Sequence, residues 1–253
     1  LPAVRAAMAD ALERWANPSS PHSEGRAARA ALEDARARLK AALGWKHELI
    51  FTSGATESLA IALGRTGNDA VLVSSVEHDA VHRVVPEAYI LPVSSDGVVA
   101  TDALFGRLSA LGAKRPLVAI QQANNETGVL QPLAELGEVV RDKGGILLAD
   151  CAQTAGKIDL PEADLIAVSA HKIGGPPGIG ALLVRDLGLI SPSGGQEKGY
   201  RAGTENMPGA VGFAVAAEAG RGWMSRAADL RQHMDAAIEA AGGEIVAKVS
   251  DRI

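Results

Sequence analysis

In Ser169-Ala170-His171-Lys172-Ile173-Gly174-Gly175-Pro176-Pro177-Gly178-Ile179-Gly180, Lys172 lies between an apolar run and a loop rich in glycine and proline. Residues 164–169 read as a short buried strand, and residues 180–184 read as the next one. Lys172 is therefore expected at a strand end, where α/β proteins build their sites. Most lysines are solvated surface residues, so the surrounding sequence has to decide whether Lys172 has another role.

Apolar runs and helical patterns alternate through most of the chain. The predicted strands are 48–52, 70–74, 117–121, 145–149, 164–169 and 180–184. The helices predicted between them are 55–63, 79–85, 102–111 and 133–143. This alternation predicts an α/β fold with a mostly parallel sheet and helices on both faces.

Helical patterns also occupy both ends of the chain. Residues 1–15 and 25–43 have the spacing of two helices, and the charges of the second helix predict a solvated face rather than a binding site. Near Gly220 a second segment begins, in which a helical pattern over 224–241 leads to a strand-like run at 244–249.

The composition excludes several classes of protein. With 253 residues, 47% of them apolar, the chain is long enough to bury a sizeable core. Its net charge of −5 and scattered basic residues argue against a nucleic-acid or anionic-membrane surface. No apolar run is long enough to span a membrane, and the single cysteine fits a reducing compartment. We therefore expect a cytoplasmic protein.

Two segments that join a strand to a helix are suited to an anion and to a cation. Backbone amides at Ser53, Ala55 and Thr56, beside hydroxyl groups, form an anion site suited to a phosphate, although an ordinary helix cap explains them equally well. Asp150 ends the apolar run 145–149, and a buried carboxylate there needs a partner such as a protonated ring nitrogen. A structural Asp150 that caps the next helix, with Gln153 on the surface, is the alternative.

Further polar residues follow neighbouring strands. His78 and Asn125 come after the runs 70–74 and 117–121, where a structural histidine and a turn are the ordinary explanations. Convergence at one sheet edge favours a site, and we expect the following residues to gather there: Thr56, His78, Asn125, Asp150, Gln153 and Lys172. A reactive Lys172 must be desolvated or near positive charge. An aldehyde cofactor with a phosphate tail, pyridoxal phosphate, matches this set.

These motifs together resemble the NifS/IscS-like cysteine desulfurases of the class V aminotransferase group. The matching stretches run through nearly the whole chain, and they are 17–22 with 25–26, 52–58, 77–78, 124–128, 150–153, 169–172, 195–197 and 201–206. The resemblance implies the large domain of a type I pyridoxal phosphate-dependent transferase over 1–219 and the start of a small C-terminal domain over 220–253. Matching so many motifs in order by chance is implausible.

The resemblance also implies a role for each residue of the expected site. Lys172 matches the lysine that forms a Schiff base with the cofactor and moves the substrate α-proton. Asp150 matches the partner of the ring nitrogen, Gln153 that of the ring hydroxyl, and His78 the residue stacked on the ring as a candidate acid/base. Asn125 matches a residue beside the ring that helps to bind the substrate carboxylate. The expected phosphate-binding residues are Ala55, Thr56, Ser169 and His171, with Thr204 reaching the phosphate of a partner subunit in a homodimer.

The chain also departs from the family pattern. Family members open with a further strand and continue into a small domain that supplies a nucleophilic cysteine and an arginine for the substrate carboxylate, and neither has a counterpart here. Cys151 is predicted to be a small core residue instead. The implied reaction converts L-cysteine to L-alanine and an enzyme persulfide for a sulfur-acceptor protein. We expect this chain to form the cofactor site without completing sulfur transfer.

Two alternatives remain open from the sequence. A relative such as a selenocysteine lyase or an aminotransferase would act on another amino acid, and the amino acid that converts the bound cofactor would identify it. A non-catalytic scaffold would bind a partner and show no cofactor band in the visible spectrum.

Overall fold

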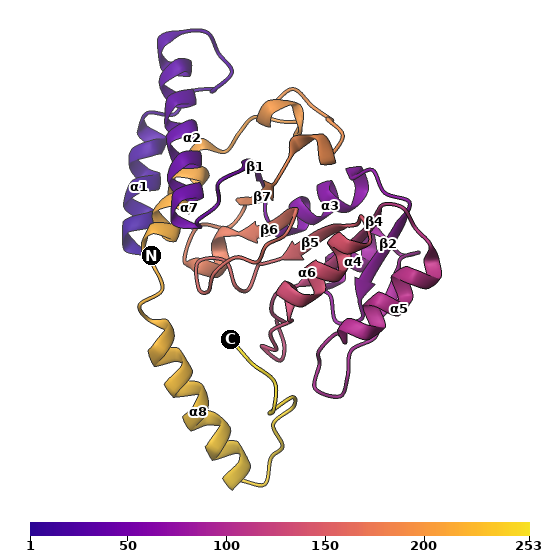
Figure 1. The fold of residues 1–253 in the computed structure, drawn as a ribbon. Helices are drawn as coiled ribbons and strands as arrows, with labels where there is room; N and C mark the ends of the chain where they lie inside the picture. The colour runs from indigo at the N-terminus through magenta and orange to yellow at the C-terminus, as the bar shows by residue number, and fades with distance from the viewer.

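A seven-stranded sheet forms the centre of the molecule, in the order β1-β7-β6-β5-β4-β2-β3 (Figure 1). The computed structural model describes all 253 residues. The strands are β1 Glu48–Thr52, β2 Ala70–Ser74, β3 Tyr89–Leu91, β4 Pro116–Gln121, β5 Ile146–Asp150, β6 Leu165–Ser169 and β7 Gly180–Val184. Only β7 runs antiparallel to its neighbours, so the predicted mostly parallel sheet is confirmed.

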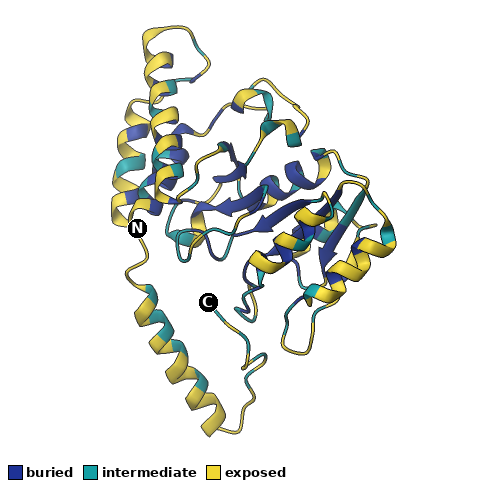
Figure 2. Ribbon diagram, in the orientation of Figure 1, coloured by how far each residue is buried: buried dark blue, intermediate teal, exposed yellow.

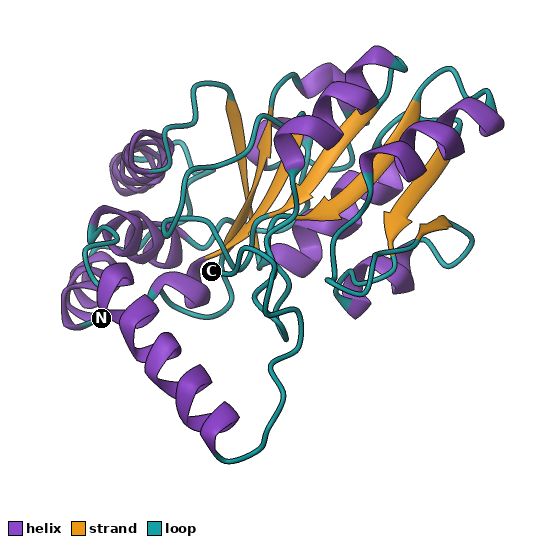
Figure 3. Cartoon of the chain, turned by 60° about the horizontal axis from the view of Figure 1, so that its bottom comes forward, coloured by secondary structure: helices purple, strands orange, loops and turns teal.

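Helices cover both faces of this sheet (Figure 3). One apolar core lies between the sheet and a first group of helices, α1 Pro2–Glu13, α2 Ser23–Ala42, α5 Thr101–Leu111, α6 Leu133–Asp142 and α7 Met207–Glu218. A second core lies on the opposite face, under α3 Ala55–Arg65 and α4 Asp79–Val84. The three layers confirm the predicted α/β class. They also explain the nearly continuous apolar runs of the central strands, which are buried on both faces.

The register of the strands brings their ends to one edge of the sheet. Gln121 pairs with Asp150, which in turn pairs with Ala167. Farther along the same edge, Gly180 at the start of β7 lies between Ser169 of β6 and Thr52 of β1. The loops that follow β1, β2, β4, β5 and β6 therefore leave the sheet at the same edge.

Two elements have no predicted counterpart. The strand β3 has only three residues, two of them exposed, and so carries too little apolar pattern to be recognised. The helix α7 is buried almost all round, between α1 and α2 on one side and the sheet on the other, and its sequence lacks the polar stripe of a surface helix.

The C-terminal segment leaves the three layers. The helix α8 Met224–Ala240 was expected over 224–241, and none of its residues is buried (Figure 2). The strand predicted at 244–249 is wrong, because Ala247 has a φ of 53° that breaks an extended chain, and Val249 is 81% exposed. The segment returns to the body at its end, where the Leu130 amide donates to the Asp251 carbonyl at 2.8 Å.

The solvated face predicted for the second helix is wrong at Arg36. This side chain is buried, and its guanidinium donates to both carboxylate oxygens of Glu197, at 2.7 and 3.0 Å. The charge spacing along α2 alone could not reveal a partner 161 residues away. Elsewhere, the helices all fall short of the combined length and apolarity that a membrane span requires.

Candidate active site

A cavity of about 540 Å³ opens at the sheet edge where β1, β2, β4, β5 and β6 end. Every residue of the expected cofactor site except Thr204 lines it, namely Ala55, Thr56, His78, Asn125, Asp150, Gln153, Ser169, His171 and Lys172. These residues lie at the ends of five strands or in the segments that follow them, and the parallel strands bring these segments together.

Asp150 lies at the end of β5 with its carboxylate in the wall of the cavity. The side chain is buried, and its oxygen Oδ1 accepts the backbone N–H of Ala152 at 2.9 Å. Burial raises the pKa of Asp150, while the charges of His78 and Lys172 lower it. The carboxylate forms no ion pair within the chain, so a cation in the cavity would meet an unneutralised acid.

The loop between β1 and α3 offers backbone amides to the cavity. Gly54 is the N-cap residue of α3, and no side chain caps the first turn of this helix. Such a turn is a ready site for an anion. Gly180 permits the arrangement, because a Cβ at this position would lie 2.6 Å from the Cα of Gly54.

Two further polar residues lie at the end of β6 and just after it, at the same edge. The hydroxyl of Ser169 and Nδ1 of His171 are 2.8 Å apart and share a hydrogen bond. The backbone of this turn forms a short 3-10 helix, Ala170–Ile173, which also carries Lys172. Ser169 and His171 thus add hydrogen-bonding groups to the cavity that holds the amides of the first turn of α3.

His78 is the N-cap residue of α4. Its Nδ1 accepts the backbone N–H of Ala80 at 3.1 Å, which leaves Nε2 as the ring nitrogen not engaged by the backbone. In the neutral ring this hydrogen bond places the proton on Nε2. His78 therefore meets a ligand in the cavity as a hydrogen-bond donor.

Lys172 is exposed in the open cavity, so desolvation within the chain alone does not make it reactive. A second positive charge is close to it. The pKa of Lys157 is lowered by burial and by the charge of Lys172. The turn that carries Lys157 packs on the residue next to Lys172, because a Cβ at Gly156 would lie 3.3 Å from Ile173.

Asn125 lies in the loop after β4, whose shape is fixed by its neighbour. The side-chain oxygen of Asn124 accepts the backbone N–H groups of Glu126 and Thr127, both at 2.9 Å. The side-chain nitrogen of Asn124 donates to the carbonyl of Val76 at 3.2 Å. These bonds tie the loop of Asn125 to the segment that carries His78.

Sequence reasoning missed two residues near the cavity. Gln121, at the end of β4, lines the cavity, and its position as the polar residue ending an apolar strand could have identified it. Glu77 is buried and accepts the hydroxyl of Ser74 and the backbone N–H of Gln121, the latter at 2.9 Å. Burial raises the pKa of Glu77 to about 8, and no local pattern distinguishes such a residue from an exposed glutamate.

Two other residues of interest lie apart from the cavity. Thr204 is exposed in the loop before α7 and does not line the cavity. Cys151 is fully buried in the core, as predicted, and burial raises the pKa of its thiol.

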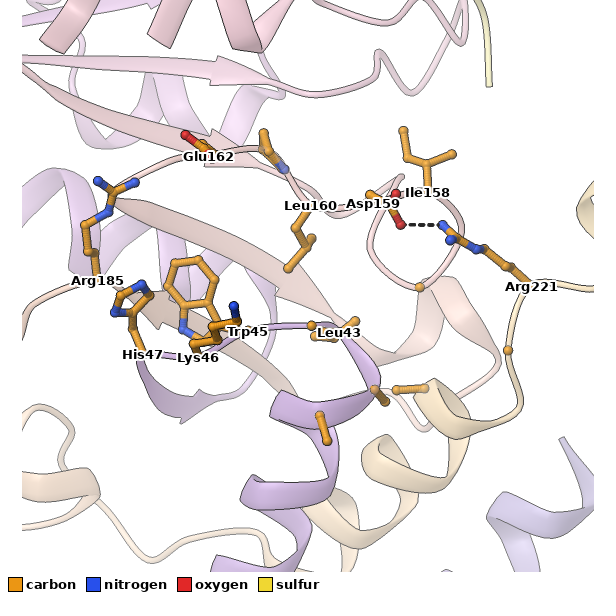
Figure 4. A pocket seen from close by; sticks show the side chains of 17 residues that line it. Leu43, Trp45, Lys46, His47, Ile158, Asp159, Leu160, Glu162, Arg185 and Arg221 are labelled. Carbon is orange, nitrogen blue, oxygen red and sulfur yellow. Dashed lines mark hydrogen bonds and ion pairs between the residues drawn. The ribbon is translucent and has the colours of Figure 1, made fainter. Parts of the chain in front are cut away.

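A larger cavity of about 770 Å³ lies at the opposite edge of the sheet (Figure 4). Trp45, Lys46, His47 and Arg185 lie on one side of it, while Asp159 and Arg221 form an ion pair of 2.8 Å on the other. None of the residues expected to carry chemistry lines this cavity. Size alone therefore does not identify the active site.

The chain matches one protein family over most of its length. The family model described as aminotransferase class-V matches residues 1–244. The cysteine desulfurase of Bradyrhizobium diazoefficiens is 38% identical over 226 residues, which cover 81% of this chain and 57% of that protein. The cysteine desulfurase IscS 1 of Archaeoglobus fulgidus is 36% identical, with coverage of 93% and 66%. The chain thus spans about three fifths of the length of these relatives.

Solved structures agree with the sequence comparison. A NifS-like protein from Rickettsia africae superposes with a TM-score of 0.93 and 29% identity, covering 100% of this chain and 76% of that one. A structure described as SspA in complex with cysteine has a TM-score of 0.77 and 29% identity, with coverage of 86% and 69%.

Proposed function

The chain belongs to the aminotransferase class-V family, and from this membership we propose that it is the cofactor-binding part of a cysteine desulfurase. The reaction would convert L-cysteine to L-alanine and leave the sulfur as an enzyme-bound persulfide. Relatives named cysteine desulfurase and a neighbour described in complex with cysteine support the substrate. The main observation is the cavity in which Lys172, Asp150 and His78 lie together.

The cavity fits pyridoxal phosphate, the cofactor of this family. The acid in its wall is Asp150, whose buried carboxylate has no ion-pair partner in the chain and suits a protonated ring nitrogen. The anion site in the same wall is the uncapped first turn of α3, with Ala55, Thr56, Ser169 and His171 among the lining residues. The acid and the anion site suit the ring nitrogen and the phosphate, the opposite charges of one molecule.

Each wall residue would hold a different part of the cofactor. Lys172 would anchor it covalently, Gln153 would bind the ring hydroxyl, and His78 would cover a face of the ring. Asn125 would lie beside the ring and contact the substrate carboxylate. The lone pair on Nδ1 of His78 is already used by Ala80, so this residue would donate from Nε2.

When bound, pyridoxal phosphate supplies an electron sink for charge that develops on the substrate α-carbon. Asp150 would keep the ring nitrogen protonated through a charge-assisted hydrogen bond worth about 1.5–3 kcal/mol. Lys172 would take the proton from the α-carbon and return it as a general base and acid.

The sulfur would be accepted by a thiol that is not Cys151. This is the only cysteine of the chain, and it is fully buried with a raised pKa, whereas the attacking species must be an exposed thiolate. We propose that residues 1–219 form the large domain and that 220–253 begin a small domain. The exposed α8 supports this division.

We also propose that the protein forms a cytoplasmic homodimer and passes sulfur to an acceptor protein. The exposed position of Thr204, in a loop held by buried residues, supports a role across a subunit interface. A single cysteine without a disulfide supports a reducing compartment.

The test is amino-acid turnover by the full-length protein loaded with pyridoxal phosphate. L-Cysteine is expected to yield alanine and protein-bound sulfur in wild type and no alanine in Lys172→Ala. The matched control is Lys114→Ala, which replaces an exposed lysine outside the cavity. Turnover of selenocysteine or a keto-acid pair in preference to L-cysteine would contradict the proposed substrate.

A further inference from the structure

The segment Gln196–Asn206, which carries Thr204, is held in a strained conformation by buried charges. Glu197 and Lys198 both have left-handed backbones, with φ of 48° and 58°. This region costs a non-glycine residue roughly 1–2 kcal/mol, so the surroundings must hold the segment in place. Glu197 and Glu205 do so from inside the fold, with exposed fractions of 1% and 2%.

Glu197 fixes the start of this segment to α2 and β1. Both carboxylate oxygens of Glu197 accept from Arg36 of α2, and Oε2 also accepts the backbone N–H of Phe51 in β1, at 2.8 Å. The segment therefore begins at a rigid point on the strand that leads into the anion-binding turn at Ser53–Thr56.

Glu57 connects the segment directly to that turn. Glu57, in the first turn of α3, accepts the backbone N–H of Ser53 with Oε2. Its other oxygen, Oε1, accepts from Nε of Arg201 at 3.0 Å. One carboxylate thus joins the two ends of the anion-binding turn to each other and to the segment of Thr204.

The charge of Glu57 is compensated in this arrangement. Burial raises its pKa, but the hydrogen bond from Ser53 and the pairing with Arg201 outweigh burial, and the pKa of Glu57 is lowered overall. Glu57 is therefore ionised at neutral pH. Beside an anion site, such a carboxylate is tolerable only while Arg201 neutralises it.

We propose that Glu57 is a positioning residue that preforms the phosphate site and, through Arg201, fixes the segment of Thr204 in register with it. The proposal rests on the proposed function, because the phosphate is that of the cofactor. Glu57 acts through the backbone of Ser53 and through Arg201, and it does not touch the phosphate itself. A site fixed before binding spares the ligand the cost of ordering it.

The experiment compares two probes that differ only in phosphate, pyridoxal phosphate and pyridoxal, on the full-length protein. Glu57→Gln keeps an acceptor for Ser53 but loses the pairing with Arg201. This variant is expected to bind pyridoxal phosphate about tenfold more weakly than the wild type and to bind pyridoxal equally well. Arg201→Gln is expected to lower the affinity for pyridoxal phosphate further, because it leaves a carboxylate uncompensated near the phosphate. Arg201→Lys is expected to restore part of this affinity.

The double variant measures the energetic coupling between Glu57 and Arg201. Glu57→Gln/Arg201→Gln is expected to bind pyridoxal phosphate better than Arg201→Gln alone, since the uncompensated carboxylate is gone. Arg221→Gln, which breaks the ion pair with Asp159 at the opposite sheet edge, is the matched control and should bind both probes as wild type does. Equal losses for both probes, or no loss in Glu57→Gln, would overturn the role of Glu57.

Inorganic phosphate separates this inference from the proposed function. It is expected to bind the wild type and to bind Glu57→Gln about tenfold more weakly, whether or not a cofactor band forms. A wild type that binds phosphate but shows no cofactor band contradicts the proposed function alone. Equal phosphate binding by the two proteins, or no phosphate binding by either, contradicts the role of Glu57.

Discussion

At the scale of single residues, the polar groups at the strand ends differ most in their electrostatic surroundings. Asp150 and Glu77 are both buried acids close to the same edge, yet Asp150 faces the cavity while Glu77 bonds to Ser74 and Gln121 behind it. The first is placed to meet a ligand, and the second is placed to hold the loops that meet it. The two acids therefore call for separate tests.

Replacement of Asp150 tests its assignment to the ring nitrogen. Asp150→Asn keeps the shape of the side chain and removes the charge, so the cofactor should still attach to Lys172. The rate of conversion of L-cysteine should fall about 10- to 100-fold, because a charge-assisted hydrogen bond of about 1.5–3 kcal/mol is lost. The rate of cofactor band change after mixing with L-cysteine measures this effect, and an unchanged rate would refute the assignment.

The raised pKa of Glu77 predicts a pH dependence of stability. The folded chain keeps a proton on Glu77 up to a pKa of about 8, whereas the unfolded chain loses it near the ordinary glutamate pKa of 4.5. The folded state binds more protons between these values, so stability falls there as pH rises, by up to about 1.4 kcal/mol per pH unit. Above pH 8 this contribution is constant.

The variant Glu77→Gln removes this titration and keeps an acceptor for Ser74 and Gln121. Urea unfolding of wild type and variant from pH 5 to 9 should show the variant gaining stability relative to wild type as pH rises to 8. A difference that does not change with pH would show that Glu77 is ionised in the folded chain.

At the scale of elements, the central strands could be predicted because each is a continuous apolar run buried on both faces. The residues that end these strands could be placed together because parallel strands share an edge. The strand expected at 244–249 was wrong because its valines have no partner strand to cover them and lie exposed. Local pattern measures the tendency of a segment to be extended, and pairing decides whether it becomes a strand.

Contacts between distant elements could not be predicted in this way. The pairing of Arg201 with Glu57 joins residues 144 apart in the chain, and the pairing of Arg36 with Glu197 joins residues 161 apart. Spacing along a helix assigned Arg36 to a solvated face, and only the fold brings its partner to it. The supports of the candidate site are therefore visible only in the structure.

The close approach of Gly180 to Gly54 can be tested by substitution. Gly180→Ala would place a Cβ 2.6 Å from both the Cα of Gly54 and the carbonyl oxygen of Val168. The turn at Ser53–Thr56 must move, so we expect a loss of about 1–3 kcal/mol in unfolding free energy and weaker binding of pyridoxal phosphate. Denaturant unfolding and cofactor titration measure the two effects.

Gly64→Ala is the matched control, because Gly64 lies in α3, the helix that Gly54 caps, and has open space at its Cβ position. This variant should gain up to about 1 kcal/mol from helix propensity. If Gly180→Ala were as stable as Gly64→Ala and bound the cofactor normally, the close approach would not position the turn.

At the scale of the whole molecule, the three layers bring the ends of five strands to one edge, and the cavity there is lined both by a buried acid and by the uncapped first turn of a helix. The fold class and the set of edge residues followed from the sequence. The exposure of Lys172 did not, because solvent access depends on what else surrounds the cavity. The extended course of α8 could not be predicted either, since its helical pattern does not specify where the helix packs.

Covalent trapping locates the lysine that carries pyridoxal phosphate, which we propose to be Lys172. Reduction of the cofactor-loaded protein with borohydride, followed by proteolysis and mass spectrometry, locates the attached cofactor. We predict its mass on the peptide that contains Lys172, and no stable adduct in Lys172→Ala. An adduct on Lys157 or another lysine, with Lys172 unmodified, would show that Lys172 does not carry the cofactor.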